Sequence, residues 1–382
     1  MRTALNLVAV FAAWALWLGG PSAAWPAGPA AAKVTALAGE VRVSGRALKV
    51  GDTVAEDEEI ATGLEGRATL EFADRSVVRV RTDSRLRIEP NRGPGAPAAG
   101  EIRLRLDSGA ADVAVAKQGT PSFAIASPSG SLTAARGAEF RARARADALL
   151  VEVLQGAVAV ASLNGETVEA GAGFGTQVKR ANAPLAPVRL LGAPDISGVG
   201  QLQQRSVVQL RFAPVAGAAR YRIVAAADRE LRDVIVDYRP RQPELRILEL
   251  EDGEYFYGVR AIDALDLDGL EVRGHFRLKA RPVPPAPNTP LPGAVLAPGN
   301  VTFSWEATSG EAVAYRFQLA ADDAFTAILV DRGRIAAMAS VVETLKPGRY
   351  YWRVASLRAG GDQGPFGDTQ LVTLRVPEPQ KQ

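Results

Sequence analysis

The sequence offers few side chains suited to catalysis or metal binding. It contains no cysteine and one histidine, His275. A thiol nucleophile, a disulfide and a cysteine-ligated zinc site are therefore excluded, and a Ser-His-Asp triad would have to use this histidine. No nucleophile or carboxylate lies at a recognisable spacing from His275, so we interpret it as a strand residue without a catalytic role. We predict no enzymatic activity, no cofactor and no metal site.

Three carboxylates precede a glycine late in the chain: Asp263, Asp266 and Asp268 before Gly269. Spaced carboxylates can bind calcium, but this run lacks the full loop pattern and its distal glutamate. A turn between two strands, built from Asp and Gly, is the favoured interpretation.

Arginine alternates with other residues along several predicted strands. Stacked strands could align these side chains as a basic stripe for an anionic glycan, a lipid headgroup or an acidic partner. The favoured alternative is a solvated face balanced by acidic neighbours such as those at 56–59. Arg136 and Glu139 flank Gly137 and are interpreted first as a pair that holds a turn, and second as a partner contact. The candidate partner-binding residues are Arg79, Arg81, Arg103, Arg105, Arg136, Glu139, Arg141, Arg143 and Arg145.

Exposed charges contribute at most about 1 kcal/mol each to stability. We therefore expect that replacing Arg141, Arg143 and Arg145 by Ser weakens binding to a partner and changes stability little.

The elements that must position these side chains are predicted to be β-strands throughout. The chain has 382 residues, 47% hydrophobic and 23% charged, which is typical of two or three globular domains. Short period-2 runs close on Gly, Asp, Asn or Pro, and no long amphipathic helix is evident. The formal net charge is only +3, so no strong polyelectrolyte partner is implied, and the predicted export disfavours nucleic acid.

The N-terminus has the features of an export signal, predicted at residues 1–24. Arg2 precedes an uncharged, mostly apolar run at 5–18, and Ser22 and Ala24 satisfy the small-residue rule for cleavage after Ala24. The alternative is an uncleaved inner-membrane anchor, although the run is shorter than the roughly 20 residues that span a bilayer. We expect the protein in the periplasm or cell envelope, in contact with the membrane only if this segment is retained.

Proline-rich stretches at 181–194 and 281–299 are predicted to be linkers, and a third at 90–100 to be a loop inside the first domain. The two pieces that follow the first linker repeat each other. Tyr221-Arg222-Ile223 matches Tyr315-Arg316-Phe317 at an offset of 94 residues, and 253–259 matches 348–354 after one insertion. A repeat of this length has the size of one small β-sandwich. We place the two sandwiches at 195–281 and 287–377.

Alternation within each repeat indicates its core. Phe212 and Trp305 occupy equivalent positions on an early strand, and we predict that both are buried. Later, Tyr255 and Tyr350 begin a Tyr-x-φ-x pattern that resembles fibronectin type III domains. The resemblance implies that each of these tyrosines makes a corner hydrogen bond.

The region from 34 to 180 carries a series of short phrases in a fixed order. They are Gly39-Glu40-Val41, Val50-Gly51-Asp52, Ile60-Ala61-Thr62-Gly63, Phe72-Ala73-Asp74, Leu106-Asp107-Ser108-Gly109, Ile125-Ala126-Ser127-Pro128, Arg136-Gly137-Ala138-Glu139-Phe140 and Leu154-Gln155-Gly156. In this order they resemble the FecR family. The family usually has Asp-Gly-Ser where this chain has Asp74-Arg75-Ser76. The resemblance implies a twisted, solenoid-like β-domain, while the strand pattern alone also allows a sandwich.

The best-known members of the FecR family sense a periplasmic signal and relay it to a cytoplasmic anti-sigma segment. Only Met1, Arg2 and Thr3 precede the apolar run here, so this chain resembles the exported FecR-domain proteins with added modules. We expect a non-catalytic binding or scaffold protein whose partner is an envelope protein or an anionic glycan. The alternative is a signal-sensing regulator that works with a membrane partner. An envelope enzyme acting on glycans is the least favoured hypothesis, because no pair of catalytic carboxylates stands out.

Overall fold

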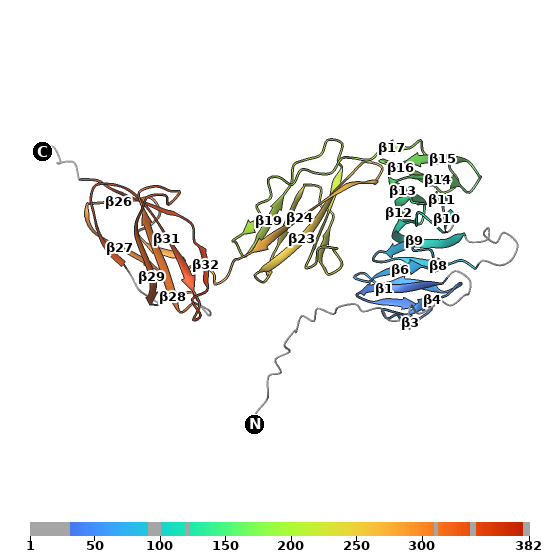
Figure 1. The fold of residues 1–382 in the computed structure, drawn as a ribbon. Coiled ribbons are helices and arrows are strands. Elements are labelled where there is room, and N and C mark those ends of the chain that lie inside the picture. The colour runs from blue at the N-terminus through green and yellow to red at the C-terminus, as the bar shows by residue number, and fades with distance from the viewer. Residues whose placement is uncertain (1–30, 91–100, 120–121, 309–311, 337–340, 377–382) are drawn as a thin grey trace, which may run out of the picture.

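A computed structural model describes residues 31–90, 101–119, 122–308, 312–336 and 341–376. Every secondary-structure element in these residues is a β-strand, which confirms the all-β prediction for this part of the chain. The strands form three bodies in a row along the molecule (Figure 1). No helix in the described ranges is long and apolar enough to cross a membrane. The predicted signal segment, and all of the predicted loop except Pro90, lie outside the described residues.

Among the described residues, the first domain is a coil of seventeen strands, most of them short. They are β1 (Ala32–Ala38), β2 (Val41–Val43), β3 (Arg46–Ala47), β4 (Thr53–Val54), β5 (Glu59–Thr62), β6 (Arg67–Phe72), β7 (Val77–Val80), β8 (Arg85–Ile88), β9 (Ile102–Ala114), β10 (Ser122–Ser127), β11 (Gly130–Ala135), β12 (Glu139–Ala144), β13 (Ala148–Gln155), β14 (Ala157–Ser162), β15 (Thr167–Gly171), β16 (Phe174–Lys179) and β17 (Val188–Arg189). The long strand β9 joins two sets of paired strands: its first part pairs with β8 and β10, and its second part with β7 and β12. Because the chain moves back and forth between the two sets, the arrangement is closer to the solenoid-like alternative.

The core of this domain lies between the two sets of strands and runs from Ala32 to Val178. Phe123 stands at its centre, with its ring 6.3 Å from the rings of both Phe72 and Phe140, edge to face. The departure from the family pattern at Arg75 falls on a residue with φ of 74°, in the left-handed region that favours glycine. The turn is therefore kept, although its residue type is unfavourable there.

The first sandwich has two sheets. A five-stranded sheet contains β18 (Leu202–Gln203), β24 (Asp268–Leu278), β23 (Gly253–Ile262), β20 (Arg220–Ala226) and β21 (Val234–Tyr238), and β19 (Val208–Arg211) pairs with β22 (Glu244–Ile247) in the other. Alternate side chains of both sheets meet in one core that contains Phe212, Tyr257 and Phe276.

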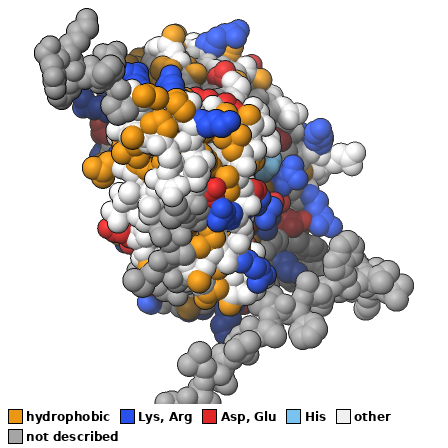
Figure 2. All heavy atoms as spheres, turned by 90° about the vertical axis from the view of Figure 1, so that its left-hand side faces the viewer, with side chains coloured by type: hydrophobic (Ala, Val, Ile, Leu, Met, Phe, Trp, Pro, Cys, Tyr) orange, Lys and Arg blue, Asp and Glu red, His pale blue; other side chains and the backbone are white. Residues whose placement is uncertain are grey.

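The second sandwich repeats this plan. One sheet contains β25 (Pro287–Thr289), β27 (Gly299–Trp305) and β30 (Val341–Leu345), and the other contains β26 (Ala294–Leu296), β33 (Gln370–Leu374), β31 (Gly348–Leu357), β28 (Ala314–Ala320), β29 (Ile328–Ala336) and β32 (Gln363–Phe366). Trp305 is 5% exposed in the core, as predicted. Leu291 and Val295 are well exposed, and apolar and basic side chains intermingle on this end of the molecule (Figure 2).

Equivalent side chains make equivalent hydrogen bonds in the two sandwiches. The Tyr255 hydroxyl donates to the carbonyl of Glu251 at 2.8 Å, and the Tyr350 hydroxyl donates to that of Lys346 at 3.1 Å. These are the corner bonds that the fibronectin-like pattern implies, one in each copy. Arg222 and Asp237 also form a two-bond pair in the first sandwich, and its counterpart in the second is Arg316 with Asp331.

Candidate functional site

The arginines of β12 do not lie on a solvated face. Phe140, Ala142 and Ala144 point into the core of the first domain, so Arg141 and Arg143 point out of its sheet. There the first sandwich covers them, and they are 5% and 7% exposed. The expectation that these two side chains are exposed, and replaceable with little loss of stability, is wrong. The alternating pattern is the same whether water or another domain covers the polar face.

Arg143 is the centre of a buried ion network between the two domains. Its Nη1 donates to Asp266 Oδ2 at 3.0 Å, and its Nη2 donates to Asp268 Oδ1 at 3.0 Å. The same Nη2 donates to Glu152 Oε1 at 3.1 Å, and this oxygen also accepts the backbone N–H of Asp268 at 3.0 Å. One guanidinium of the first domain is thus held by two carboxylates of the first sandwich and one of its own.

Asp268 is completely buried and gathers further arginines. Arg260 of the same sandwich and Arg81 of the first domain lie 3.4 Å and 3.7 Å from its Oδ2. Burial alone would raise the pKa of Asp268, but the surrounding guanidinium groups, Arg143 foremost, hold it well below its usual range. Burial also raises the pKa of Glu152, which shares the site with Asp268 and Arg143.

Arg141 is held in a different way. Its Nη1 donates to the backbone carbonyls of Asp268 at 3.2 Å and Gly269 at 2.9 Å. Burial, followed by the nearby Arg260, lowers the pKa of Arg141 to about 10. Among the described carboxylates, none forms an ion pair with Arg141 within 4 Å, so its positive charge is only partly compensated.

An apolar contact extends the interface beyond the charges. Leu190 and Leu267 pack against Ala148 and Leu150, which lie on the outward face of β13. Leu190 belongs to the stretch 181–194, and its N–H donates to the carbonyl of Gly173 at 2.8 Å. This stretch therefore packs against both domains, and the prediction that it is a spacer is wrong.

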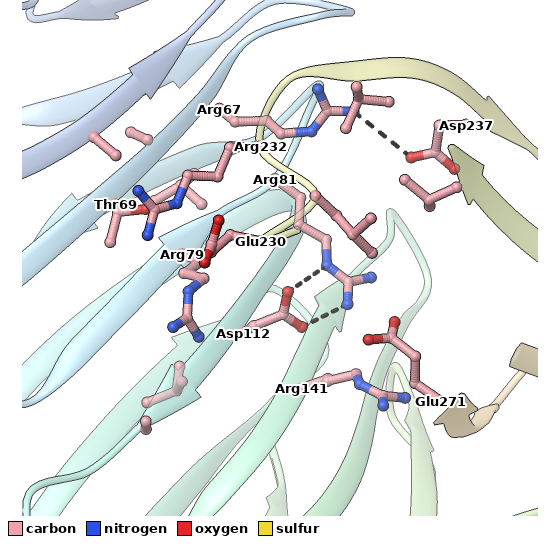
Figure 3. A pocket seen from close by; sticks show the side chains of 18 of the residues that line it. Arg67, Thr69, Arg79, Arg81, Asp112, Arg141, Glu230, Arg232, Asp237 and Glu271 are labelled. Atoms are coloured by element: carbon pink, nitrogen blue, oxygen red, sulfur yellow. Dashed lines mark hydrogen bonds and ion pairs between the residues drawn. The ribbon is translucent and has the colours of Figure 1, made fainter. Parts of the chain in front are cut away.

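Beside the network, the two domains diverge and leave a cleft of about 630 Å³. One wall is the outward face of β6, β7, β9 and β12, and the other is the face of β20, β21, β23 and β24 (Figure 3). Arg81 crosses the cleft floor and is paired with Asp112, its Nε donating at 2.8 Å. Arg67 reaches toward Asp237 of the sandwich, 3.8 Å away. The cleft is thus a composite of two domains, with charged side chains from both.

A family model described as FecR protein matches residues 58–159. These residues form a FecR domain. The core around them extends on both sides, to Ala32 and Val178. The FecR family is a regulatory family rather than a family of enzymes. A search of curated proteins found no match.

Three solved structures are similar to parts of the chain. A putative anti-sigma factor from Parabacteroides distasonis is 17% identical, with 34% of this chain and 59% of that chain covered and a TM-score of 0.28. This chain therefore spans less than two thirds of that protein's length. A two-domain fibronectin type III segment of chicken tenascin is 14% identical, with 48% and 99% covered and a TM-score of 0.22. The fibronectin(III)-like modules of Clostridium thermocellum CbhA are 12% identical, with 48% and 93% covered and a TM-score of 0.21.

The candidate arginines do not form one stripe on the FecR domain. Arg79, Arg81, Glu139 and Arg141 line the cleft. Arg143 lies in the buried network, and Arg145 pairs with Asp266 at its edge.

The other three candidates lie outside the cleft and the network. Arg103 and Arg105, on the first part of β9, pair with Glu101 at 3.5 Å and Asp107 at 2.8 Å. Arg136 donates to the carbonyl of Gly119 at 3.0 Å. Whether any of these residues binds a partner stays a prediction.

The sequence favours a turn role for Asp266 and Asp268, with calcium binding as the alternative. A turn is present, since the carboxylate of Asp263 accepts the N–H groups of Leu265 and Leu267 at 2.9 and 2.8 Å. Sequence reasoning missed the second role of Asp266 and Asp268. A comparison of the two copies carries the signal, because Asp268 corresponds to Gln363, whose oxygen accepts from Arg316 at 3.1 Å. The second sandwich therefore lacks the charge that neutralises the FecR arginines.

Proposed function

We propose that this protein is a non-catalytic binding protein of the cell envelope, in which the FecR domain and the first sandwich act as one recognition unit. The observation that carries the proposal is the composite cleft, whose two walls come from different domains joined by a buried ion network. Clefts between domains are preferred places for binding. Fixed walls also reduce the conformational entropy that binding costs. We expect the partner to be an envelope protein or an anionic glycan.

The test is capture of partners from intact envelopes by the full chain and by two matched variants. Arg79→Gln with Arg232→Gln removes two charges from the cleft. Arg103→Gln with Arg105→Gln removes two charges from β9 outside it. We expect only the first variant to lose the partners that the wild type captures. Capture that survives the first variant but not the second would refute the proposal.

The same samples test export. N-terminal sequencing should begin at Trp25, after cleavage behind Ala24. A chain that retains Met1 and stays in the membrane pellet would contradict cleavage.

A second candidate function is signal sensing with a membrane partner, as in regulatory members of the FecR family. The match at residues 58–159 favours it. It predicts that a membrane protein co-purifies with the chain and that added citrate or tripolyphosphate, used as anionic probes of the arginine-lined cleft, changes the amount recovered. Equal recovery with and without the probes would refute this function.

A further inference from the structure

The cleft carries an excess of positive charge. Eight arginines and five carboxylates line it, namely Arg67, Arg79, Arg81, Arg141, Arg222, Arg232, Arg260 and Arg273 with Asp112, Glu139, Glu230, Asp237 and Glu271. Each wall contributes both arginines and carboxylates. Five of these arginines are buried or partly buried, and their charges are screened less by solvent than charges on an open surface. Arg79, Arg232 and Arg273 are exposed.

Some of the arginines that line the cleft have no carboxylate partner of their own. Arg81 is taken by Asp112, and Arg222 by Asp237. Glu271 serves both Arg260 and Arg273. Among the described residues, Arg79, Arg141 and Arg232 make no ion pair within 4 Å, and Arg67 reaches only the already paired Asp237 at 3.8 Å. The uncompensated charge therefore comes from the FecR wall and from the loop before β21.

Burial makes part of this excess of positive charge costly. Arg141 is 5% exposed, and a buried cation without a carboxylate is unfavourable unless an anion joins it. The pKa of Arg67 is lowered by burial and by the neighbouring Arg222 and Arg81, although Asp237 opposes the shift. Both observations indicate a place where an anion would be stabilised.

We propose that the cleft binds a compact small molecule that carries at least two carboxylate or phosphate groups. This inference rests on the proposed function and goes beyond it, because it places a small ligand in the cleft in addition to the envelope partner. Guanidinium groups bind both kinds of group through paired hydrogen bonds. The volume of about 630 Å³ falls within the range of small-molecule sites, about 300–1,000 Å³. Val224 and Leu231 also line the cleft and are partly exposed, so an apolar frame of the ligand has side chains to contact between its charges.

The observations favour a small ligand over a membrane or a long glycan. Arg141 lies between the two domains, where a flat lipid surface does not reach it. Glycan sites commonly offer aromatic faces for stacking, but the one aromatic ring among the lining residues, Phe140, is 1% exposed. A compact anion can enter between the walls and contact arginines from both domains.

The experiment is calorimetric titration of the purified full chain with tripolyphosphate and with citrate at low salt. We expect saturable binding of at least one probe, with an affinity that falls as salt rises past about 0.15 M. Arg79→Gln with Arg232→Gln should weaken this affinity at least tenfold, because charge-assisted hydrogen bonds are individually worth more than a factor of ten. Both side chains lack ion pairs, so the variant should keep its thermal unfolding temperature.

The matched control is Arg85→Gln with Arg87→Gln. It removes the same charge from β8, where both arginines pair with Glu59 outside the cleft. Equal weakening by both variants would show nonspecific attraction and overturn the proposal. No binding of either probe, or binding only to vesicles that contain phosphatidic acid, would also overturn it. If the purified protein binds neither probe while envelope capture still depends on Arg79 and Arg232, the small-ligand inference fails and the proposed function stands.

Discussion

Replacing Asp268 by Asn should separate the FecR domain from the first sandwich. Four arginine side chains have a nitrogen within 4.0 Å of this fully buried carboxylate, those of Arg143, Arg260, Arg81 and Arg222. The substitution keeps the volume but removes the charge that compensates them. Removing one partner of a buried ion pair costs about 3–5 kcal/mol. Asparagine still accepts a hydrogen bond, so we expect the free energy of unfolding to fall by about 3 kcal/mol. This is a large part of the 5–15 kcal/mol that is typical of a domain.

The assay is urea unfolding of the full chain with two signals. The tryptophans among the described residues, Trp305 and Trp352, both lie in the core of the second sandwich, so fluorescence follows mainly that body. Hydrogen exchange in β12 and β24 follows the interface. The control is Asp331→Asn, which breaks the half-exposed pair with Arg316 and should cost less than about 1 kcal/mol. A loss below about 1 kcal/mol for Asp268→Asn, or equal losses for both variants, would refute the reasoning.

Three further outcomes are expected. Trp305→Ala should destabilise the second sandwich by about 3–5 kcal/mol, measured by the fluorescence of Trp352 in urea; a loss under about 1 kcal/mol would place Trp305 outside the core. Arg75→Gly should stabilise the FecR domain by up to about 1 kcal/mol in thermal unfolding, because it relieves a φ of 74°, and a lower melting temperature would contradict this. The pKa values of Asp268 and Asp112 lie below the ordinary value of 3.8. Near and below pH 4 these two carboxylates bind more protons in the unfolded chain than in the native one, so their protonation should destabilise the interface; Asp268→Asn should flatten this pH dependence, and an unchanged slope would count against it.

The strands, the repeat and the aromatic core could be predicted from the sequence because local alternation encodes them. Trp305 is buried and Tyr350 makes its corner bond because each sits at a fixed place in a period-2 strand. The docking of two domains does not follow from any local sequence pattern of this kind. Arg143 and Asp268 lie 125 residues apart, and an arginine every second residue on β12 predicts a solvated face equally well. The pattern determines which face is polar but not what covers it.

The two sandwiches differ at positions near the face that packs against the FecR domain. Gly258 of the first corresponds to Arg353 of the second, whose guanidinium lies 3.8 Å from the centre of the Phe325 ring and 4.2 Å from that of Phe366. The second sandwich thus satisfies its own arginine with its own aromatic rings, which is a favourable cation–π arrangement. At the corresponding place, the first sandwich has a glycine.

The first sandwich instead presents Asp266 and Asp268 to a neighbour that has arginines to pair with them. These two charges distinguish the copy that packs against the FecR domain from the copy that does not. We infer that these pairs favour one specific docking, because a mispaired arrangement would leave a buried charge without its partner. The cleft that results is a property of that pairing, and neither domain alone contains both of its walls.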